Sequence, residues 1–362
     1  MNDFMLGNEA IARGAYEAGV RLVSSYPGTP STEITEYCAK YPEIYAEWAA
    51  NEKVALEVCA GASMAGARSI CCMKHVGLNV ASDPLYTLAY TGVNGGLVVV
   101  VADDPGMHSS QNEQDSRMHA RGSQVPMLEP SDSDECRAFT KLAFELSEKY
   151  DTPVFVRTTT RVAHARSVVH PQERVEAALK PYQKDISKWV MMPGMAKGRH
   201  VVVEKRMNDL AKDASSLPVN RVEMGDTKIG VICSGMAYQY VKEVAPEISV
   251  LKLGIVNPLP MDLIADFARQ VETLYVFEEL EPVIEEQVAA HGIPVTGKAL
   301  TGRQGELSAH KVAKLLGKEI PTAAQPDPVP ARPPVLCPGC PHRGVYAVLN
   351  KLKCTVTGDI GC

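Results

Sequence analysis

The carboxyl-terminal cysteines carry the sharpest chemical signal in the sequence. Cys337 and Cys340 form a Cys-x-x-Cys pair, and Cys354 and Cys362 follow closely. Such a pair places two thiolates on one tight turn, an arrangement that serves both zinc sites and iron–sulfur clusters. A tetrahedral zinc site would take its remaining ligand from Cys354 or His342. The spacing alone leaves the choice between zinc and a cluster open.

A single glutamate is a candidate for proton transfer. Glu52 precedes a run of small and apolar residues that predicts a helix over 52–66. A helix of this composition packs closely, so burial would raise the pKa of the carboxyl group at its start and suit it to proton transfer. A carboxylate in a first helical turn also stabilises the helix dipole without any catalytic role. On spacing alone, this simpler role is favoured.

Two short loops follow predicted strands and offer further polar groups. The first, over 26–31, reads Tyr-Pro-Gly-Thr-Pro-Ser and presents the hydroxyl of Thr29. The second holds Lys74, which could meet an anion, and His75, which titrates near neutral pH, just ahead of Gly77. A capped turn and a structural histidine are the ordinary alternatives.

A third polar segment, over 103–121, is too long for a simple connector. It contains His108, Asp115, Arg117 and His119. Long polar loops are often functional. The chain shows no Ser-His-Asp pattern, no nucleotide-binding glycine fingerprint and no phosphate loop.

Alternating helix and strand patterns must position these residues. The apolar run from Leu97 to Ala102 is bounded by Gly95-Gly96 and Asp103-Asp104, which predicts a buried strand. Strands are also expected over 22–23, 69–73 and 154–157, with helices between them. This order predicts an α/β fold with a parallel sheet, whose strands end at the polar loops. Ligands of such folds bind at that edge.

Pattern and composition divide the chain into five parts. The first α/β unit covers 1–165, and a more charged connecting segment covers 166–226. The α/β rhythm resumes in a smaller unit over 227–320. A proline-rich linker follows over 321–334. Residues 335–362 are too few to bury a core without a metal or a partner, so the sequence is expected to be truncated within a third domain.

Length and composition limit the class of protein. The chain has 362 residues, with 37 Lys and Arg against 43 Asp and Glu, for a net charge of −6. This balance gives no electrostatic footprint for nucleic acid. The chain is 45% hydrophobic and 22% charged without a long apolar run, which argues against disorder and against a membrane protein. Ten cysteines and the absence of a signal-peptide pattern predict a cytoplasmic protein with reduced thiols.

Several motifs in order carry a family resemblance. Ser25 to Ser31, Asn51 to Ala55 and Met73 to Asn79 resemble the pyrimidine-binding domain of thiamine-diphosphate-dependent 2-oxoacid:ferredoxin oxidoreductases. Within that family, the chain is most similar to the large (alpha) subunits of the indolepyruvate type. Residues 227–320 fall where the family has a transketolase-carboxyl-terminal-like domain, and 335–362 resemble the opening of the diphosphate-binding domain.

The resemblance implies roles for individual residues. Glu52 matches the carboxylate that hydrogen-bonds the aminopyrimidine of the cofactor and promotes ylid formation. Thr29 matches a hydroxyl that faces the substrate carbonyl. Lys74, His75 and Gly77 lie on a loop that approaches the cofactor, without an assigned step.

The resemblance also implies metals. Cys337, Cys340 and Cys362 match ligands of the [4Fe–4S] cluster nearest the thiamine, whose fourth cysteine lies further along the chain, and Cys354 is left as a packed thiol. The family holds Mg²⁺ and the diphosphate with a Gly-Asp-Gly motif, which has no counterpart before Cys362.

The implied activity is oxidative decarboxylation of an aryl pyruvate to an acyl-coenzyme A with reduction of ferredoxin. The expected partners are a smaller beta subunit, ferredoxin and coenzyme A, in an oligomer that binds neither nucleic acid nor membrane. Pyruvate-specific relatives carry an arginine where this chain has Asp103, so indolepyruvate is expected over pyruvate. The alternatives are a non-oxidative thiamine-dependent decarboxylase, such as sulfopyruvate decarboxylase, and a non-catalytic subunit with structural zinc.

Overall fold

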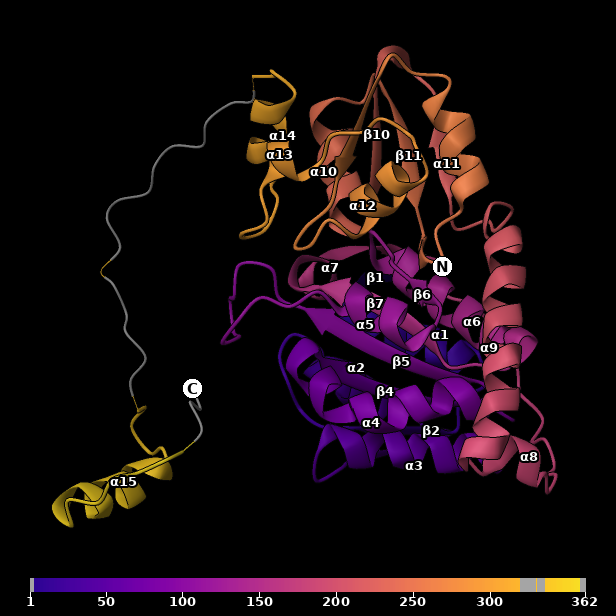
Figure 1. The fold of residues 1–362 in the computed structure, drawn as a ribbon. Coiled ribbons are helices and arrows are strands. Elements are labelled where there is room, and N and C mark those ends of the chain that lie inside the picture. Colours follow the sequence, from indigo (N-terminus) through magenta and orange to yellow (C-terminus); the bar gives the residue numbers. More distant parts are fainter. Residues whose placement is uncertain (1–2, 320–329, 331–335, 359–362) are drawn as a thin grey trace. The chain divides into compact units, whose positions relative to one another are not determined.

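The structure is a computed structural model that describes residues 3–319, 330 and 336–358 (Figure 1). The chain forms two compact units, one up to residue 320 and one from residue 321 onward. The first unit contains two α/β lobes. We call the one built on a seven-stranded sheet the large lobe, and the one built on a four-stranded sheet the small lobe.

The large lobe is built on a mostly parallel sheet in the order β12-β6-β7-β5-β4-β2-β3. Its strands are β2 (Leu22–Ser25), β3 (Tyr45–Trp48), β4 (Ser69–Lys74), β5 (Leu97–Asp103), β6 (Met127–Leu128), β7 (Val154–Thr159) and β12 (Ile255–Asn257). Neighbouring strands are parallel except β12, which is antiparallel to β6. The predicted parallel sheet is therefore confirmed, with an antiparallel edge strand that the sequence did not indicate.

Helices cover both faces of this sheet because its central strands are apolar on both sides. Every residue of β5 is buried, and alternate side chains enter opposite cores: Val98 and Val100 face one, and Val99 and Val101 the other. The first core is covered by α1 (Gly7–Glu17), α2 (Thr32–Cys38) and α6 (Ser133–Tyr150). The second is covered by α3 (Glu52–Met64), α4 (His75–Thr91) and α5 (Ser116–Ser123).

The small lobe has the sheet order β13-β10-β11-β9. Its strands are β9 (Arg221–Glu223), β10 (Asp226–Ser234), β11 (Ile248–Leu253) and β13 (Thr273–Phe277), of which only β9 is antiparallel to its neighbour. Its helices are α10 (Gly235–Val244), α11 (Met261–Ala268), α12 (Val283–Ala290), α13 (Lys298–Thr301) and α14 (Ala309–Leu315). The alternation of strands and helices predicted for this part of the chain is confirmed.

The segment between the lobes is partly helical. It contains α7 (Thr160–His164), α8 (Ile186–Trp189) and the long α9 (Pro193–Ala214), while β8 (Arg166–Val169) pairs with β1 (Asp3–Leu6). Helix α9 contacts the carboxyl-terminal end of α4, where Arg199 of α9 donates a 2.6 Å hydrogen bond to the carbonyl of Tyr90. Strand β12, although it lies in the small lobe's part of the sequence, joins the large sheet.

The structure describes residue 330 and residues 336–358 of the second unit. It contains α15 (His342–Lys351), none of whose side chains is buried. The predicted linker over 321–334 lies outside the described residues except for position 330. In the part of the chain that the structure describes, no helix is long and apolar enough to cross a membrane.

Candidate active site at the carboxyl ends of the parallel strands

The predicted site residues gather at one edge of the large sheet. Strands β4, β5 and β7 are in register, with Lys74 opposite Ala102 and Asp103 opposite Thr159. Strand β2 ends at Ser25, directly before the loop over 26–31. This is the edge where ligands of parallel α/β sheets bind.

Glu52 lies in the first turn of α3 and is almost fully buried. Asn51 caps the helix, and its side-chain oxygen accepts a 3.0 Å hydrogen bond from the backbone N–H of Val54. Only 8% of Glu52 is exposed. Burial raises the pKa of its carboxyl group, and the hydrogen bond from its own backbone N–H opposes this only in part. The burial and the raised pKa are as the helix composition predicted, and the role of the carboxyl group in proton transfer stays a prediction.

The absence of a side chain at Gly77 makes room for the carboxyl group of Glu52. A Cβ atom at Gly77 would lie 2.5 Å from Oε1 of Glu52 and 2.6 Å from its Cγ. Helix α4 begins at His75, two residues before the glycine. Gly77 thus lies in the first turn of α4, and its missing side chain is what lets α3 bring the carboxyl group against α4.

The loop over 26–31 is a capped turn that leaves Thr29 exposed. Its shape is fixed by hydrogen bonds at Gly28, whose N–H donates to Thr32 Oγ1 at 2.9 Å and whose carbonyl accepts from Ser31 Oγ at 2.8 Å. Thr29 is exposed, and its carbonyl accepts a 3.3 Å hydrogen bond from Ser109. The capped turn and an accessible hydroxyl therefore coexist.

Lys74 and His75 end β4 in contrasting environments. The aliphatic stem of Lys74 lies against Gly28, and its Nζ donates to the Ser109 carbonyl at 3.1 Å. Burial lowers the pKa of the Lys74 ammonium, which nearby Asp104 offsets only in part. His75 is 1% exposed, and neither ring nitrogen has a hydrogen-bond partner among the described residues. Burial lowers its pKa, so the ring is neutral near pH 7.

Asp104 organises the loop that follows β5, a role the sequence analysis missed. Its carboxylate accepts hydrogen bonds from Ser109 N–H at 2.8 Å, Ser110 Oγ at 2.8 Å and Thr160 Oγ1 at 2.7 Å. Burial acts to raise the pKa of Asp104, but these hydrogen bonds outweigh it and leave the pKa below its ordinary value. An aspartate directly after a buried strand was the signal for this role.

Asp103 points into the protein rather than toward the site. Its carboxylate pairs with Arg157 at 2.7 Å, and Arg157 also contacts Glu129 at 2.6 Å. All three side chains are buried. The carboxylate of Asp103 is therefore neutralised by an arginine of β7.

The predicted polar segment over 103–121 serves mainly to join the lobes. Arg117 is 1% exposed and pairs with Asp115 and with Glu278 of the small lobe, each at 2.6 Å. His108 approaches Glu306 of the small lobe at 3.3 Å. This segment connects the edge of the large sheet to the small lobe, and Asp115 and Arg117 are both buried.

Cys337 and Cys340 share one turn, as predicted. The N–H of Cys340 donates to the carbonyl of Cys337 at 3.0 Å, and Gly339 takes the left-handed φ of 84° that the turn requires. Cys337 and Cys354 are exposed, and Cys362 lies outside the described residues. Among the residues with described positions, no three Cys, His, Asp or Glu side chains form a metal-binding group.

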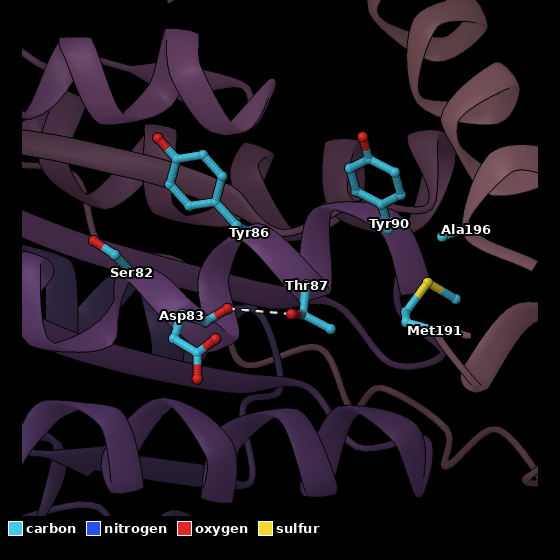
Figure 2. A pocket seen from close by; sticks show the side chains of 7 residues that line it. All are labelled: Ser82, Asp83, Tyr86, Thr87, Tyr90, Met191 and Ala196. Atoms are coloured by element: carbon cyan, nitrogen blue, oxygen red, sulfur yellow. Dashed lines mark hydrogen bonds between the residues drawn. The ribbon is translucent and has the colours of Figure 1, made fainter. Parts of the chain in front are cut away.

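A shallow pocket lies elsewhere on the large lobe. It is lined by Ser82, Asp83, Tyr86, Thr87 and Tyr90 of α4 together with Met191 and Ala196 (Figure 2). Since these α4 residues lie beyond the first turn that carries His75 and Gly77, this pocket is separate from the candidate site.

The fold matches that of known enzymes. A solved 2-oxoglutarate:ferredoxin oxidoreductase from Magnetococcus marinus, with 2-oxoglutarate, coenzyme A and succinyl-CoA bound, aligns with a TM-score of 0.73 at 19% identity over 87% of this chain and 65% of its own. A split-gene transketolase, described as an inactive beta4 tetramer, aligns with a TM-score of 0.59 at 15% identity over 86% of this chain and 97% of its own. The fold class is an α/β parallel-sheet domain of the thiamine-diphosphate enzyme type followed by a smaller α/β lobe.

Residues 13–215 match the protein-family model described as "Pyruvate flavodoxin/ferredoxin oxidoreductase, thiamine diP-bdg". The chain belongs to this thiamine-diphosphate-binding family. Subunits named indolepyruvate oxidoreductase subunit IorA, from Pyrococcus horikoshii and Methanothermobacter thermautotrophicus, are 41% and 43% identical over 99% of this chain. The chain spans 61% and 63% of their respective lengths. A 2-oxoglutarate synthase subunit KorA from Methanocaldococcus jannaschii is 27% identical over 72% of this chain and 84% of its own length.

Proposed function

We propose that this chain is the thiamine-activating part of an enzyme that oxidatively decarboxylates an aryl pyruvate, such as indolepyruvate, to an acyl-coenzyme A. The observation that carries the proposal is the buried carboxyl group of Glu52 held against Gly77 in a thiamine-diphosphate-binding domain. The names of the relatives that align along almost the whole chain support the substrate class.

The site residues fit a nitrogen heterocycle. Bound thiamine diphosphate would supply the nucleophilic carbon that attacks a 2-oxoacid. In the proposal, Glu52 holds or moves the proton at the aminopyrimidine nitrogen, because burial has raised the pKa of its carboxyl group. Thr29 faces the substrate carbonyl with its exposed hydroxyl, and His75 and Lys74 lie beside the cofactor.

The diphosphate, its Mg²⁺ and the clusters are assigned outside the large lobe. We propose that a part of the assembly other than the described residues binds the diphosphate and Mg²⁺. Cys337, Cys340 and Cys362 would bind a [4Fe–4S] cluster together with a cysteine from further along the natural chain. The accessible pair of thiols on one turn supports this donor set.

The proposed partners are a smaller beta subunit, ferredoxin and coenzyme A, in an oligomeric complex. The proposed location is the cytoplasm. The nine cysteines within the described residues are free thiols, six of them buried, which suits a reducing compartment.

Activity is tested with the full-length protein and its partner subunit, purified without oxygen. Reduction of a low-potential acceptor should require both indolepyruvate and coenzyme A, with a higher kcat/KM for indolepyruvate or phenylpyruvate than for pyruvate, because an aromatic side chain gains binding free energy through burial. Decarboxylation without electron transfer would favour a non-oxidative decarboxylase, and a preference for pyruvate would remove the aryl assignment.

Metal analysis tests the cluster. The anaerobic full-length protein should contain iron, and Cys337→Ser should remove one cluster's worth of it. Stoichiometric zinc, with the iron content unaffected by the substitution, would show that these cysteines form a structural zinc site and not a cluster.

A further inference from the structure

The basic side chains at the carboxyl edge of the large sheet differ in whether a carboxylate already neutralises them. Arg157 contacts Asp103 and Glu129, and Arg161 donates from both Nε and Nη2 to the carboxylate of Glu306. These guanidinium groups are already paired with carboxylates of the protein. A ligand's negative charge would have to displace a carboxylate to reach them.

Lys74 lies at the same edge without such a partner. An ammonium group has three N–H donors, and among the described residues only the carbonyl of Ser109 accepts from Nζ. Asp104 is the nearest source of negative charge, but its oxygens already accept from Ser109, Ser110 and Thr160, and it forms no ion pair with Lys74. Lys74 is therefore a partly buried cation with donors to spare.

The position of the ammonium group fits a substrate rather than a structural role. The Lys74 stem packs on Gly28, beside Thr29, and Nζ reaches the loop after β5 through Ser109. Three residues along the chain from Lys74, Gly77 cradles the carboxyl group of Glu52. An anion at Nζ would thus lie between the Thr29 loop and the loop after β5.

We infer that the Lys74 ammonium binds the carboxylate of the 2-oxoacid substrate, an inference that rests on the proposed function. A 2-oxoacid carries one fixed negative charge, and a charge-assisted hydrogen bond from lysine both neutralises it and orients the adjacent carbonyl. The neutral ring of His75 adds no competing charge. Lys74 thus selects for an acid over the corresponding aldehyde or alcohol.

Direct binding to the full-length complex loaded with thiamine diphosphate tests the inference. The probes are indole-3-lactate, a non-reacting acid, and indole-3-ethanol, which lacks the carboxylate. Lys74→Met should weaken indole-3-lactate binding by about 10-fold to 100-fold, the usual scale for a hydrogen bond to a charged group. Binding of indole-3-ethanol and of thiamine diphosphate should not change, and Lys74→Arg should restore most of the loss.

Lys149→Met is the matched control. It removes an equal charge from an exposed lysine at the end of α6, whose ammonium group pairs with Asp213 of α9. Equal effects of Lys74→Met and Lys149→Met, equal effects on both probes, or a loss confined to thiamine diphosphate affinity would each overturn the inference. A complex that binds indole-3-lactate through Lys74 but oxidises no 2-oxoacid would instead refute the proposed function alone.

Discussion

Substitution of Gly77 by alanine tests whether the missing side chain positions the carboxyl group of Glu52. The new Cβ atom would lie 2.5 Å from Oε1, 2.6 Å from Cγ and 2.8 Å from Cδ of Glu52. Because the carboxyl group itself is in the way, it must move by roughly 1 Å, and a misplacement of that size can lower turnover by about 10²-fold. We therefore expect kcat of the full-length complex to fall by about 100-fold.

The stability of the Gly77→Ala variant should change much less than its activity. Overpacking costs about 1–3 kcal/mol, and alanine in a helix returns about 1 kcal/mol relative to glycine. Urea unfolding should therefore show a loss of no more than about 2 kcal/mol. Gly61→Ala is the control, because Gly61 lies on the same helix as Glu52 and a Cβ there meets no atom within 4 Å. It should leave kcat unchanged and stabilise the protein slightly.

Acceptor reduction under saturating substrate and cofactor is the assay. A folded Gly77→Ala protein with turnover near that of Gly61→Ala would refute the reasoning, because the carboxyl group would then tolerate displacement. An equal loss in both variants would point to a general effect of alanine on these helices rather than to the contact with Glu52.

Three further substitutions test the site and its support. Glu52→Gln should preserve the fold but lower turnover by about 10²-fold or more, and a folded variant with normal turnover would exclude proton transfer by this residue. Arg157→Met leaves Asp103 and Glu129 buried without a counter-charge, so urea unfolding should show a loss of roughly 3–5 kcal/mol; a loss below about 1 kcal/mol would contradict the pairing. Burial raises the pKa of Glu279 from 4.5 to about 7, so the folded protein holds this proton longer than the unfolded chain. Stability should therefore fall as the pH rises from 4.5 through 7, more in the wild type than in Glu279→Gln, and parallel profiles would refute this assignment.

Local pattern predicted the central elements because their sequence signals are strong. The run around Val99 is apolar on every residue, and Glu52 precedes a long stretch of small residues, so both the strand and the helix were found. Strand β6 has only two residues and β12 three, too few for any periodicity to show. Each of these strands forms because it pairs with the other. Pairing between segments so far apart in the sequence produces no recognisable pattern within either segment.

The sequence predicted where individual candidate residues lie in the fold, but not which distant residues they contact. Thr29, Lys74, His75 and Glu52 were identified from their positions after predicted strands or at a helix start, and the parallel register brings the strand ends together. The direction in which Asp103 points could not be predicted, because it is set by an arginine on another strand. Burial of a charge depends on such distant partners, which a single sequence does not reveal.

Strand β12 has a consequence for how the protein is synthesised. Ile255 pairs with Leu128, so β6 has no neighbour on one side until the chain has been made well into the small lobe. During that interval the nascent sheet exposes unpaired backbone groups, the condition that promotes edge-to-edge aggregation. Pairing between residues so far apart in sequence also slows folding. In any fragment that ends before β12, this edge of the sheet would stay unpaired, and its exposed backbone groups would make the fragment prone to aggregation.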